Sequence, residues 1–262
     1  MTQGDAWADG ENYERYMGRW SRKVGAGFLR WLGAGSGLAW ADVGCGTGAL
    51  TEMILAVCEP ASIEGMDASE GFVAHARRSV RDPRARFSTG DATRLPWGAG
   101  AFDVTVSGLV LHFVKDHAAM VGEMARVTRP GGQIALYVWD YAEGMQMVQR
   151  FWDAARAVNP GDAKADQAER FPVCAPGPLR GLFEGAGLRA VETRAVEVPT
   201  VFQDFDDYWA PFLGGQGSAP TYLAALDEAG RERIRAYLQA RLAPWPGPIE
   251  LTARAWAVRG VV

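Results

Sequence analysis

The sequence is poor in cysteine and holds no long apolar run. Its 262 residues include only 3 cysteines, Cys45, Cys58 and Cys174, and no Cys-x-x-Cys pair. Neither a disulfide framework nor a zinc cluster is indicated. No apolar run is long enough to span a bilayer. The first ten residues are polar and acidic, without the apolar core of a signal peptide. We therefore expect a reduced, cytoplasmic protein with no membrane span.

An excess of positive charge is also missing. The chain has 27 Lys and Arg against 31 Asp and Glu, a formal net charge of −4. Proteins that mainly bind nucleic acid usually present a basic face, so no nucleic-acid partner is predicted. Hydrophobic residues make up 48% and charged residues 22% of the chain, as in folded proteins with a sizeable core.

The middle of the chain alternates short β-like runs with helical ones. The expected strands there are Leu38–Val43, Ser62–Met66, Ala85–Thr89, Phe102–Ser107 and Gln133–Trp139. The expected helices between them are Ala49–Val57, Ser69–Val80 and Ala118–Val127. Such alternation predicts an α/β fold with a Rossmann-like, mostly parallel sheet that has helices on both faces.

The flanking segments extend this plan. Residues Glu11–Leu32 are expected to be helical, with a break near Gly18. After Trp139 the predicted helices are Met145–Val158, Leu179–Ala186, Phe205–Leu213 and helices across Pro220–Leu242, and the predicted late strands are Leu188–Val198 and Ile249–Val258. We expect a seven-stranded sheet, N-terminal helices, and a helical cap inserted among the late strands.

A glycine-rich turn follows the first expected strand. It runs Asp42-Val43-Gly44-Cys45-Gly46-Thr47-Gly48. Open parallel sheets bind ligands at the carboxyl ends of their strands, and glycine there lets the backbone come close to a ligand. The run Gly44-x-Gly46-x-x-Ala49 also satisfies the looser dinucleotide pattern, so the turn alone leaves NAD as an alternative.

Three carboxylates near the strand ends narrow the choice. Asp67 ends the second strand, where it can accept hydrogen bonds from ribose hydroxyls of either cofactor. Asp42 precedes the glycines, where it would repel a pyrophosphate but favour the ammonium of S-adenosylmethionine. Asp91 follows the third strand, where it can meet an adenine amino group. Together they favour S-adenosylmethionine.

With these residues in place, the chain resembles the class I S-adenosylmethionine-dependent methyltransferases. The matching pieces are the glycine turn, Gly65-Met66-Asp67, Gly90-Asp91-Ala92 with Leu95-Pro96-Trp97, Phe102-Asp103-Val104 and Arg129-Pro130-Gly131-Gly132. The resemblance is closest to the branch with ubiquinone and menaquinone biosynthesis enzymes and many small-molecule methyltransferases.

The resemblance implies one methyltransferase domain over 1–262 and a role for each segment. Residues 1–37 would be an N-terminal helical lid, 38–140 the cofactor-binding core, 141–178 and 202–247 cap segments, and 188–198 and 249–258 late strands. The substrate would be a small molecule. The sequence leaves the oligomeric state and the acceptor atom open, since O-, N-, S- and C-methylation can share this core.

The resemblance also implies roles for single residues. Gly44, Gly46 and Gly48 would approach the methionine and ribose; Asp67 would bind the ribose, with Met66 and Ala68 beside the adenine; Asp91 and Ala92 would hold the adenine amino edge; Ser107, Gly108 and Leu109 would face the methyl end. Arg19 or Arg15 would pair with the methionine carboxylate, and Tyr16 would line the site. A solvated helix charge is the alternative for the arginines.

Candidates for the chemistry itself are few. His112 is the best-placed general base, because it follows the fourth strand and its side chain suits proton transfer near neutral pH. The alternative is a packed histidine. Gly100, Asp103 and Asp116 form no evident ligand set, so no metal is expected. An NAD-dependent oxidoreductase and a non-catalytic S-adenosylmethionine-binding module remain as competing hypotheses.

Overall fold

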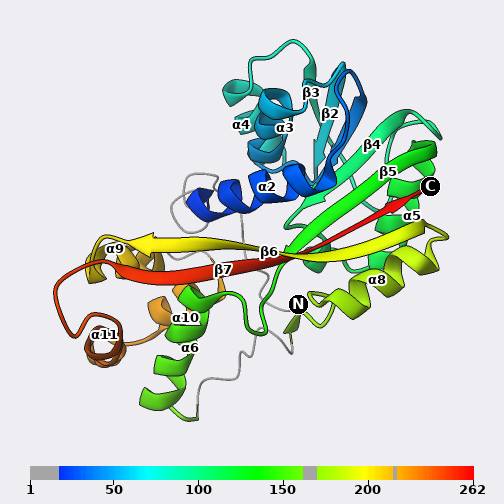
Figure 1. Ribbon diagram of the computed structural model, residues 1–262. Coiled ribbons are helices and arrows are strands. Elements are labelled where there is room, and N and C mark those ends of the chain that lie inside the picture. The colour runs from blue at the N-terminus through cyan, green and yellow to red at the C-terminus, as the bar shows by residue number, and fades with distance from the viewer. Residues whose placement is uncertain (1–17, 162–169, 215–216) are drawn as a thin grey trace. The chain divides into compact units, whose positions relative to one another are not determined.

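The computed structural model describes residues 18–161, 170–214 and 217–262. Its seven strands form one sheet in the order β3-β2-β1-β4-β5-β7-β6 (Figure 1). The strands are β1 (Ala39–Val43), β2 (Ser62–Asp67), β3 (Ala85–Thr89), β4 (Phe102–Gly108), β5 (Thr128–Trp139), β6 (Arg189–Phe202) and β7 (Ile249–Val261). The pairs among β1 to β5 are parallel and β7 is antiparallel to β5, which confirms the predicted mostly parallel sheet.

The helices follow the predicted alternation. They are α2 (Arg19–Leu32), α3 (Ala49–Val57), α4 (Glu70–Ser79), α5 (His117–Val127), α6 (Gln146–Val158), α8 (Pro176–Gly185), α9 (Phe205–Trp209), α10 (Ser218–Ala225) and α11 (Glu228–Leu242). Two short 3₁₀ helices are η2 (Leu111–Phe113) and η3 (Ala210–Gly214). No described helix is both long and apolar enough to cross a bilayer.

The chain divides into two compact units. The first, which we call the sheet unit, comprises Arg22–Trp139, Pro172–Val196 and Ala255–Val262. The second, which we call the helical unit, comprises Met1–Ser21, Asp140–Phe171 and Glu197–Arg254. Most of the segments predicted as a cap fall in the helical unit. The assignment of all 262 residues to one domain stays a prediction.

Strand β1 lies in the middle of the parallel part of the sheet. Its Asp42 is in register with Gly65 of β2 on one side and Val106 of β4 on the other. The neighbouring Trp40 and Val43 are fully buried. Because all these strands run in the same direction, their carboxyl ends form one edge, and the loops that follow them lie together.

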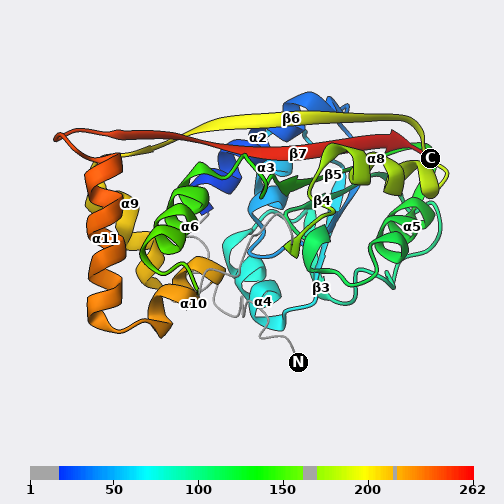
Figure 2. The same ribbon diagram turned by 90° about the horizontal axis from the view of Figure 1, so that it is seen from below.

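Helices cover this sheet through apolar faces. Helix α2 buries Trp20, Val24, Phe28, Leu29 and Leu32, which recur at helical spacing. Helix α4 packs on β2 and β3, whereas α5 packs on β4, β5 and α8, and Figures 1 and 2 both show α5 beside α8. Ser69 and Asp116 cap the first turns of α4 and α5, since each side chain accepts a hydrogen bond from a first-turn N–H.

The main difference from the prediction is the start of β5. The sequence places it at Gln133, but the strand begins at Thr128 and includes Arg129-Pro130-Gly131-Gly132. A register shift between Phe102 and Val104 absorbs these residues as an irregularity of the ladder. The end of the chain stabilises this early part of β5, because Gly131 N donates a hydrogen bond to Val262 O at 2.9 Å. Strand β6 likewise continues beyond the predicted end, to Phe202.

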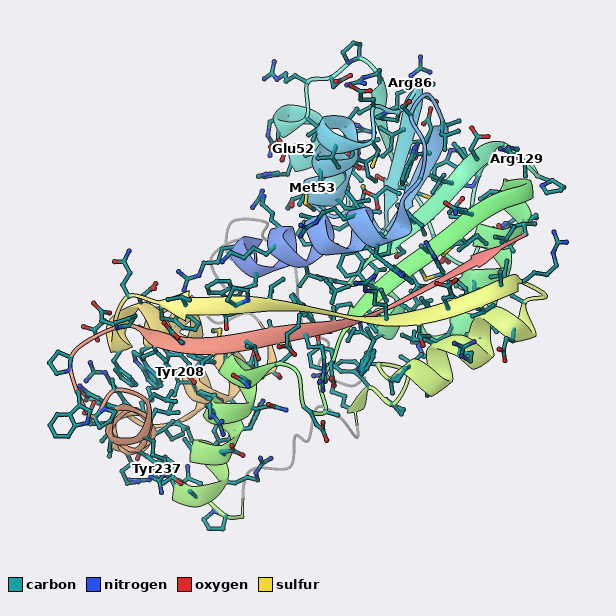
Figure 3. All side chains as sticks on the ribbon, viewed as in Figure 1. Glu52, Met53, Arg86, Arg129, Tyr208 and Tyr237 are labelled. Carbon is teal, nitrogen blue, oxygen red and sulfur yellow. The ribbon has the colours of Figure 1, made fainter. Side chains whose placement is uncertain are left out.

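The helical unit has an aromatic interior of its own. Helix α6 packs on α10 and α11, and α9 packs on η3 and α11. The hydroxyl of the buried Tyr208, labelled in Figure 3, donates to Met147 O at 2.9 Å. The rings of Phe151 and Phe212 stack with centroids 4.7 Å apart. These contacts tie segments that are about 60 residues apart in the sequence.

The fold generates a stability prediction at α2. Phe28 is fully buried and its ring lies 4.7 Å from that of Tyr137 on β5. Phe28→Ala is expected to lower the free energy of unfolding by about 3–5 kcal/mol, because a large core side chain leaves a cavity. Urea denaturation measures it. Val57→Ala, at a side chain 65% exposed, is the control and should change stability by less than about 0.5 kcal/mol.

Candidate functional site

The glycine turn lies at the carboxyl end of β1, as predicted. Gly44 N and Cys45 N donate to Met66 O at 2.7 and 2.9 Å, so the turn is tied to the end of β2. Gly44 has a φ of 76°, and a Cβ there would come within 2.5 Å of the Val110 side chain. Only glycine therefore fits this position. At Gly46, by contrast, a Cβ would meet nothing within 4 Å, so the backbone borders open space.

Asp67 links the turn to the second strand. Its Oδ2 accepts a hydrogen bond from Gly46 N at 3.0 Å, and its Oδ1 accepts one from Ser69 N at 2.9 Å. Burial raises the pKa of the Asp67 carboxyl, while these backbone N–H groups act to lower it. Each carboxylate oxygen can accept more than one hydrogen bond, so Asp67 keeps acceptor capacity for a ligand.

Asp42 has a strongly raised pKa. It is completely buried, and Oδ2 accepts a 2.7 Å hydrogen bond from the Thr51 hydroxyl. Its Oδ1 has no hydrogen-bond partner among the described residues. Burial raises the pKa of Asp42 from 3.8 to about 7; the Thr51 hydrogen bond opposes this shift and the Asp67 charge adds to it. A buried carboxyl in this state favours a positive charge as its partner.

Asp91 follows β3 and is solvated. Its Oδ1 accepts hydrogen bonds from Thr93 N and the Thr93 hydroxyl, both at 2.8 Å. These bonds lower the pKa of Asp91, so the side chain is ionised at neutral pH. Ala92 is the next residue of the same turn. The structure thus brings Asp42, Asp67 and Asp91 to the ends of three neighbouring strands.

The end of β4 carries a strained bend. Ser107 is fully buried, and its hydroxyl has no partner among the described residues. Gly108 ends the strand, and Leu109 adopts a φ of 63°. This left-handed conformation costs a non-glycine residue about 1–2 kcal/mol. Such strain persists only where the surroundings hold it, and it is typical of functional sites.

His112 lies just beyond this bend, in η2. Its side chain is buried, and its ring is 4.0 Å from the ring of Phe113. Phe113 is 46% exposed. The pair places a buried imidazole and an exposed aromatic ring on the loop that follows β4.

One predicted site residue belongs to the helical unit, and two others are not described. Arg19 belongs to the helical unit, where it forms an ion pair with Asp207 at 3.1 Å and lies 4.3 Å from the centre of the Trp20 ring. Its predicted pairing with the methionine carboxylate stays a prediction. Tyr16 and Arg15 lie outside the described residues.

The structure adds residues that the sequence analysis did not single out. Thr51 on α3 holds the Asp42 carboxyl, and Tyr137 on β5 accepts a hydrogen bond from Leu109 N at its carbonyl. Phe113 presents the exposed ring. A polar residue on the buried face of a helix is a signal that would have identified Thr51. No local pattern distinguishes Tyr137 from an ordinary core aromatic residue.

Comparison with known proteins identifies a family. Residues 41–136 match the family model of a methyltransferase domain. The chain is 30% identical to the demethylmenaquinone methyltransferase of Bacillus licheniformis, over 58% of this chain and 70% of that protein. It is 26% identical to the trans-aconitate 2-methyltransferase of Deinococcus radiodurans, over 79% of each chain. A match to the demethylmenaquinone methyltransferase of Beutenbergia cavernae is 38% identical but spans only 42% of that protein.

A solved structure shows the same fold. Phosphoethanolamine N-methyltransferase 2 of Haemonchus contortus, in complex with phosphomonomethylethanolamine and S-adenosylhomocysteine, is 14% identical. It superposes with a TM-score of 0.60 over 96% of this chain and 56% of that chain. At this identity the likeness supports the architecture alone.

Fold, site and relatives together define a Rossmann-like enzyme that uses S-adenosylmethionine. The chain belongs to the class I S-adenosylmethionine-dependent methyltransferases, in the branch related to quinone-biosynthesis enzymes. Its reaction is methyl transfer to a small molecule. The comparisons give no support to the NAD-dependent oxidoreductase or the non-catalytic module.

The residues present fit the cofactor. The open space at Gly46 gives the ligand backbone contact without a side chain in the way. The unpartnered Oδ1 of the buried Asp42 provides an acceptor for an ammonium group. No group of three or more His, Cys, Asp or Glu side chains suited to a metal lies among the described residues.

Asp42 generates a prediction about stability and pH. Its pKa in the folded chain is about 7 against an ordinary 3.8, so the folded state resists ionisation. As pH rises from 4 to 7, the Asp42 carboxyl ionises in the unfolded chain but stays protonated in the folded one. Ionisation therefore favours the unfolded state, and the wild type should lose stability relative to Asp42→Asn, which cannot ionise. The difference should reach on the order of 4 kcal/mol above pH 7. Urea denaturation of both proteins between pH 4 and 8 measures it.

A second variant checks the cause. Thr51→Val removes the hydrogen bond that opposes the shift, so the pH range of the loss should extend upward. A stability difference between wild type and Asp42→Asn that stays constant from pH 4 to 8 would contradict the prediction.

Proposed function

We propose that the edge formed by the ends of β1, β2, β3 and β4 in the sheet unit binds S-adenosylmethionine. The observation that carries this proposal is Asp42, a buried carboxyl with one unpartnered oxygen beside a turn that borders open space. A ligand with a positive charge satisfies that oxygen, and a pyrophosphate does not.

Each predicted cofactor residue has a role in this proposal. Asp42 faces the methionine ammonium; Gly44, Gly46 and Gly48 approach the methionine and ribose; Asp67 accepts from the ribose hydroxyls; Met66 and Ala68 flank the adenine; Asp91 and Ala92 hold its amino edge; and Ser107, Gly108 and Leu109 line the methyl end. Arg19 and Tyr16 are proposed at the methionine carboxylate and the substrate side. The division into a lid, a core and a cap belongs to the same proposal.

The chain's own residues mainly bind and orient. When bound, S-adenosylmethionine supplies a methyl group on a positively charged sulfur, which needs alignment more than activation. The strained bend at Leu109 and the closely packed turn at Gly44 are fixed before binding, which limits the entropy lost at reaction. Burial around Asp42 and Ser107 excludes water from the methionine side.

His112 is the proposed general base. An imidazole can accept the proton that an acceptor hydroxyl, amine or thiol releases near neutral pH. The ring of Phe113, 4.0 Å away, restricts the orientation of the imidazole. His112 follows Leu109 closely in the sequence, on the loop that begins at the proposed methyl end.

We also propose a planar, largely apolar acceptor. Phe113 exposes an aromatic ring next to His112, and rings stack on such a surface. No lysine or arginine occurs from Ser107 to Val114; the first is the exposed Lys115. A polycarboxylate would require positive charges here, so a quinol-like ring compound fits better than a tricarboxylate. The names of the demethylmenaquinone relatives support the same class.

The cofactor site is tested by Asp67→Ala. Loss of two hydrogen bonds to a carboxylate should weaken S-adenosylhomocysteine binding about 100-fold, measured by titration calorimetry. Asp103→Ala is the matched control. Asp103 also accepts from a backbone N–H, that of Ala39 at 2.8 Å, and from Arg129, but it lies at the start of β4. Its partner Arg129 lies, in Figure 3, at the end of the sheet away from Met53 of α3, the helix that follows the glycine turn, so Asp103 is distant from the proposed site. Equal affinities in the two variants would contradict the proposal.

The catalytic proposal is tested by His112→Ala. Release of S-adenosylhomocysteine is measured with a panel of quinols, phenols and polycarboxylates. Turnover of a ring acceptor should fall about 100-fold or more while cofactor affinity changes less than threefold, as is typical for a lost general base. Phe113→Ala should raise KM for ring acceptors. Normal turnover in His112→Ala, or activity confined to polycarboxylates, would contradict the proposal.

A further inference from the structure

The bend after β4 is held by one residue of the neighbouring strand. Leu109 has a φ of 63°, in the left-handed region that L side chains rarely adopt. Its N–H donates to the carbonyl of Tyr137 on β5 at 2.8 Å. Tyr137 is in register with Gly108, the last residue of β4. The backbone of Tyr137 therefore fixes the strained residue directly.

The side chain of Tyr137 contacts the same bend. A Cβ on Gly108 would come within 2.7 Å of the Tyr137 hydroxyl oxygen and 2.9 Å of Cζ. The absence of a side chain at Gly108 is what admits this ring. On α2, Gly25 lies next to the same hydroxyl, since a Cβ there would be 3.4 Å from it, an ordinary van der Waals distance.

The ring is immobilised from its other side as well. Phe28 of α2 packs on it with centroids 4.7 Å apart, and Tyr137 is only 3% exposed. Met53 of α3, labelled in Figure 3, lies against Gly25, where a Cβ would meet its Cε within 2.3 Å. The helix that covers the ring is therefore packed closely onto the helix that follows the glycine turn.

We propose that Tyr137 is a positioning residue that holds the Gly108–Leu109 bend in the conformation required at the methyl end of the cofactor. The inference rests on the proposed function, which places this bend at that end. If Tyr137 only filled space in the core, its carbonyl would not need to accept a hydrogen bond from Leu109. Its ring would also not need to pack against Gly108. Both contacts converge on Leu109, whose φ of 63° is unfavourable for an L residue, and on Gly108 directly before it.

The role has a specific consequence for binding. A bend that relaxes should lose contact with the sulfur and amino-acid part of the ligand, while Asp67 and Asp91 still hold the nucleoside. Variants at Tyr137 or Gly108 should therefore weaken S-adenosylhomocysteine but not adenosine, which lacks both the sulfur and the amino acid. General damage to the fold would weaken both ligands.

The experiment compares these two probes by titration calorimetry. Gly108→Ala is expected to lower affinity for S-adenosylhomocysteine at least tenfold and to change adenosine affinity by less than twofold. Gly122→Ala is the matched control, because a Cβ there meets nothing within 4 Å on helix α5. It should leave both affinities unchanged. Circular dichroism melting establishes that each variant is folded.

A double-mutant cycle separates positioning from packing. Tyr137→Leu keeps an apolar side chain but does not reach Gly108, so it should weaken S-adenosylhomocysteine about fivefold or more. Tyr137→Leu by itself tests the positioning role, even if Gly108→Ala does not fold. In Gly108→Ala/Tyr137→Leu the close contact is gone, and affinity should exceed that of Gly108→Ala alone.

The outcomes that overturn the inference are distinct from those that overturn the cofactor site. Wild-type affinity in Tyr137→Leu, a parallel loss of adenosine, or a double variant no better than Gly108→Ala would each overturn it. If Asp67→Ala also binds S-adenosylhomocysteine normally, the proposed site itself fails. If Asp67→Ala is impaired and the Tyr137 variants are not, only the positioning role fails.

Discussion

A buried carboxyl group without a counter-charge among the described residues lies on β1, in the middle of the parallel part of the sheet, and much of the proposed site depends on it. Asp42 sits between β2 and β4, fully buried, with a single hydrogen bond from Thr51 and a pKa of about 7. An apolar residue there would make the sheet more stable. In the proposed function, the ammonium group of the cofactor would offset this cost by meeting the carboxyl when the cofactor binds.

The order of the fold is well predicted by the sequence, because it depends on local patterns. Helix α3 is predicted at its observed bounds, since Gly48 begins it and apolar residues recur along one face. The parallel core follows from alternation alone. The predicted start of β5 is wrong. Residues Arg129–Gly132 have the composition of a loop, but they become part of the strand through pairing with the end of the chain. Long-range pairing leaves no trace in a window of ten residues.

The candidate site likewise contains residues that the sequence predicts and residues that only the structure reveals. Asp67 and Asp91 are found from the sequence because each follows a strand and carries a polar group to the shared edge. Thr51, Phe113 and Tyr137 are not, since their importance lies in which distant atoms they touch. A cofactor recognised by backbone turns and strand ends leaves strong sequence motifs. An acceptor recognised by shape and by loop conformation leaves few, which is why the substrate class depends on the exposed ring at Phe113.

The bounds of the two units fall inside continuous elements, with β6 passing from one to the other at Val196 and β7 at Arg254. Neither unit is a contiguous stretch of chain, so no single truncation yields either of them intact. The inserted segments 140–171 and 197–254 can nevertheless vary in length and composition without changing the strand order of the cofactor core. All five parallel strands lie within 22–139, outside these insertions, so a change of length in an insertion leaves the strand ends of the proposed cofactor site in the same unit.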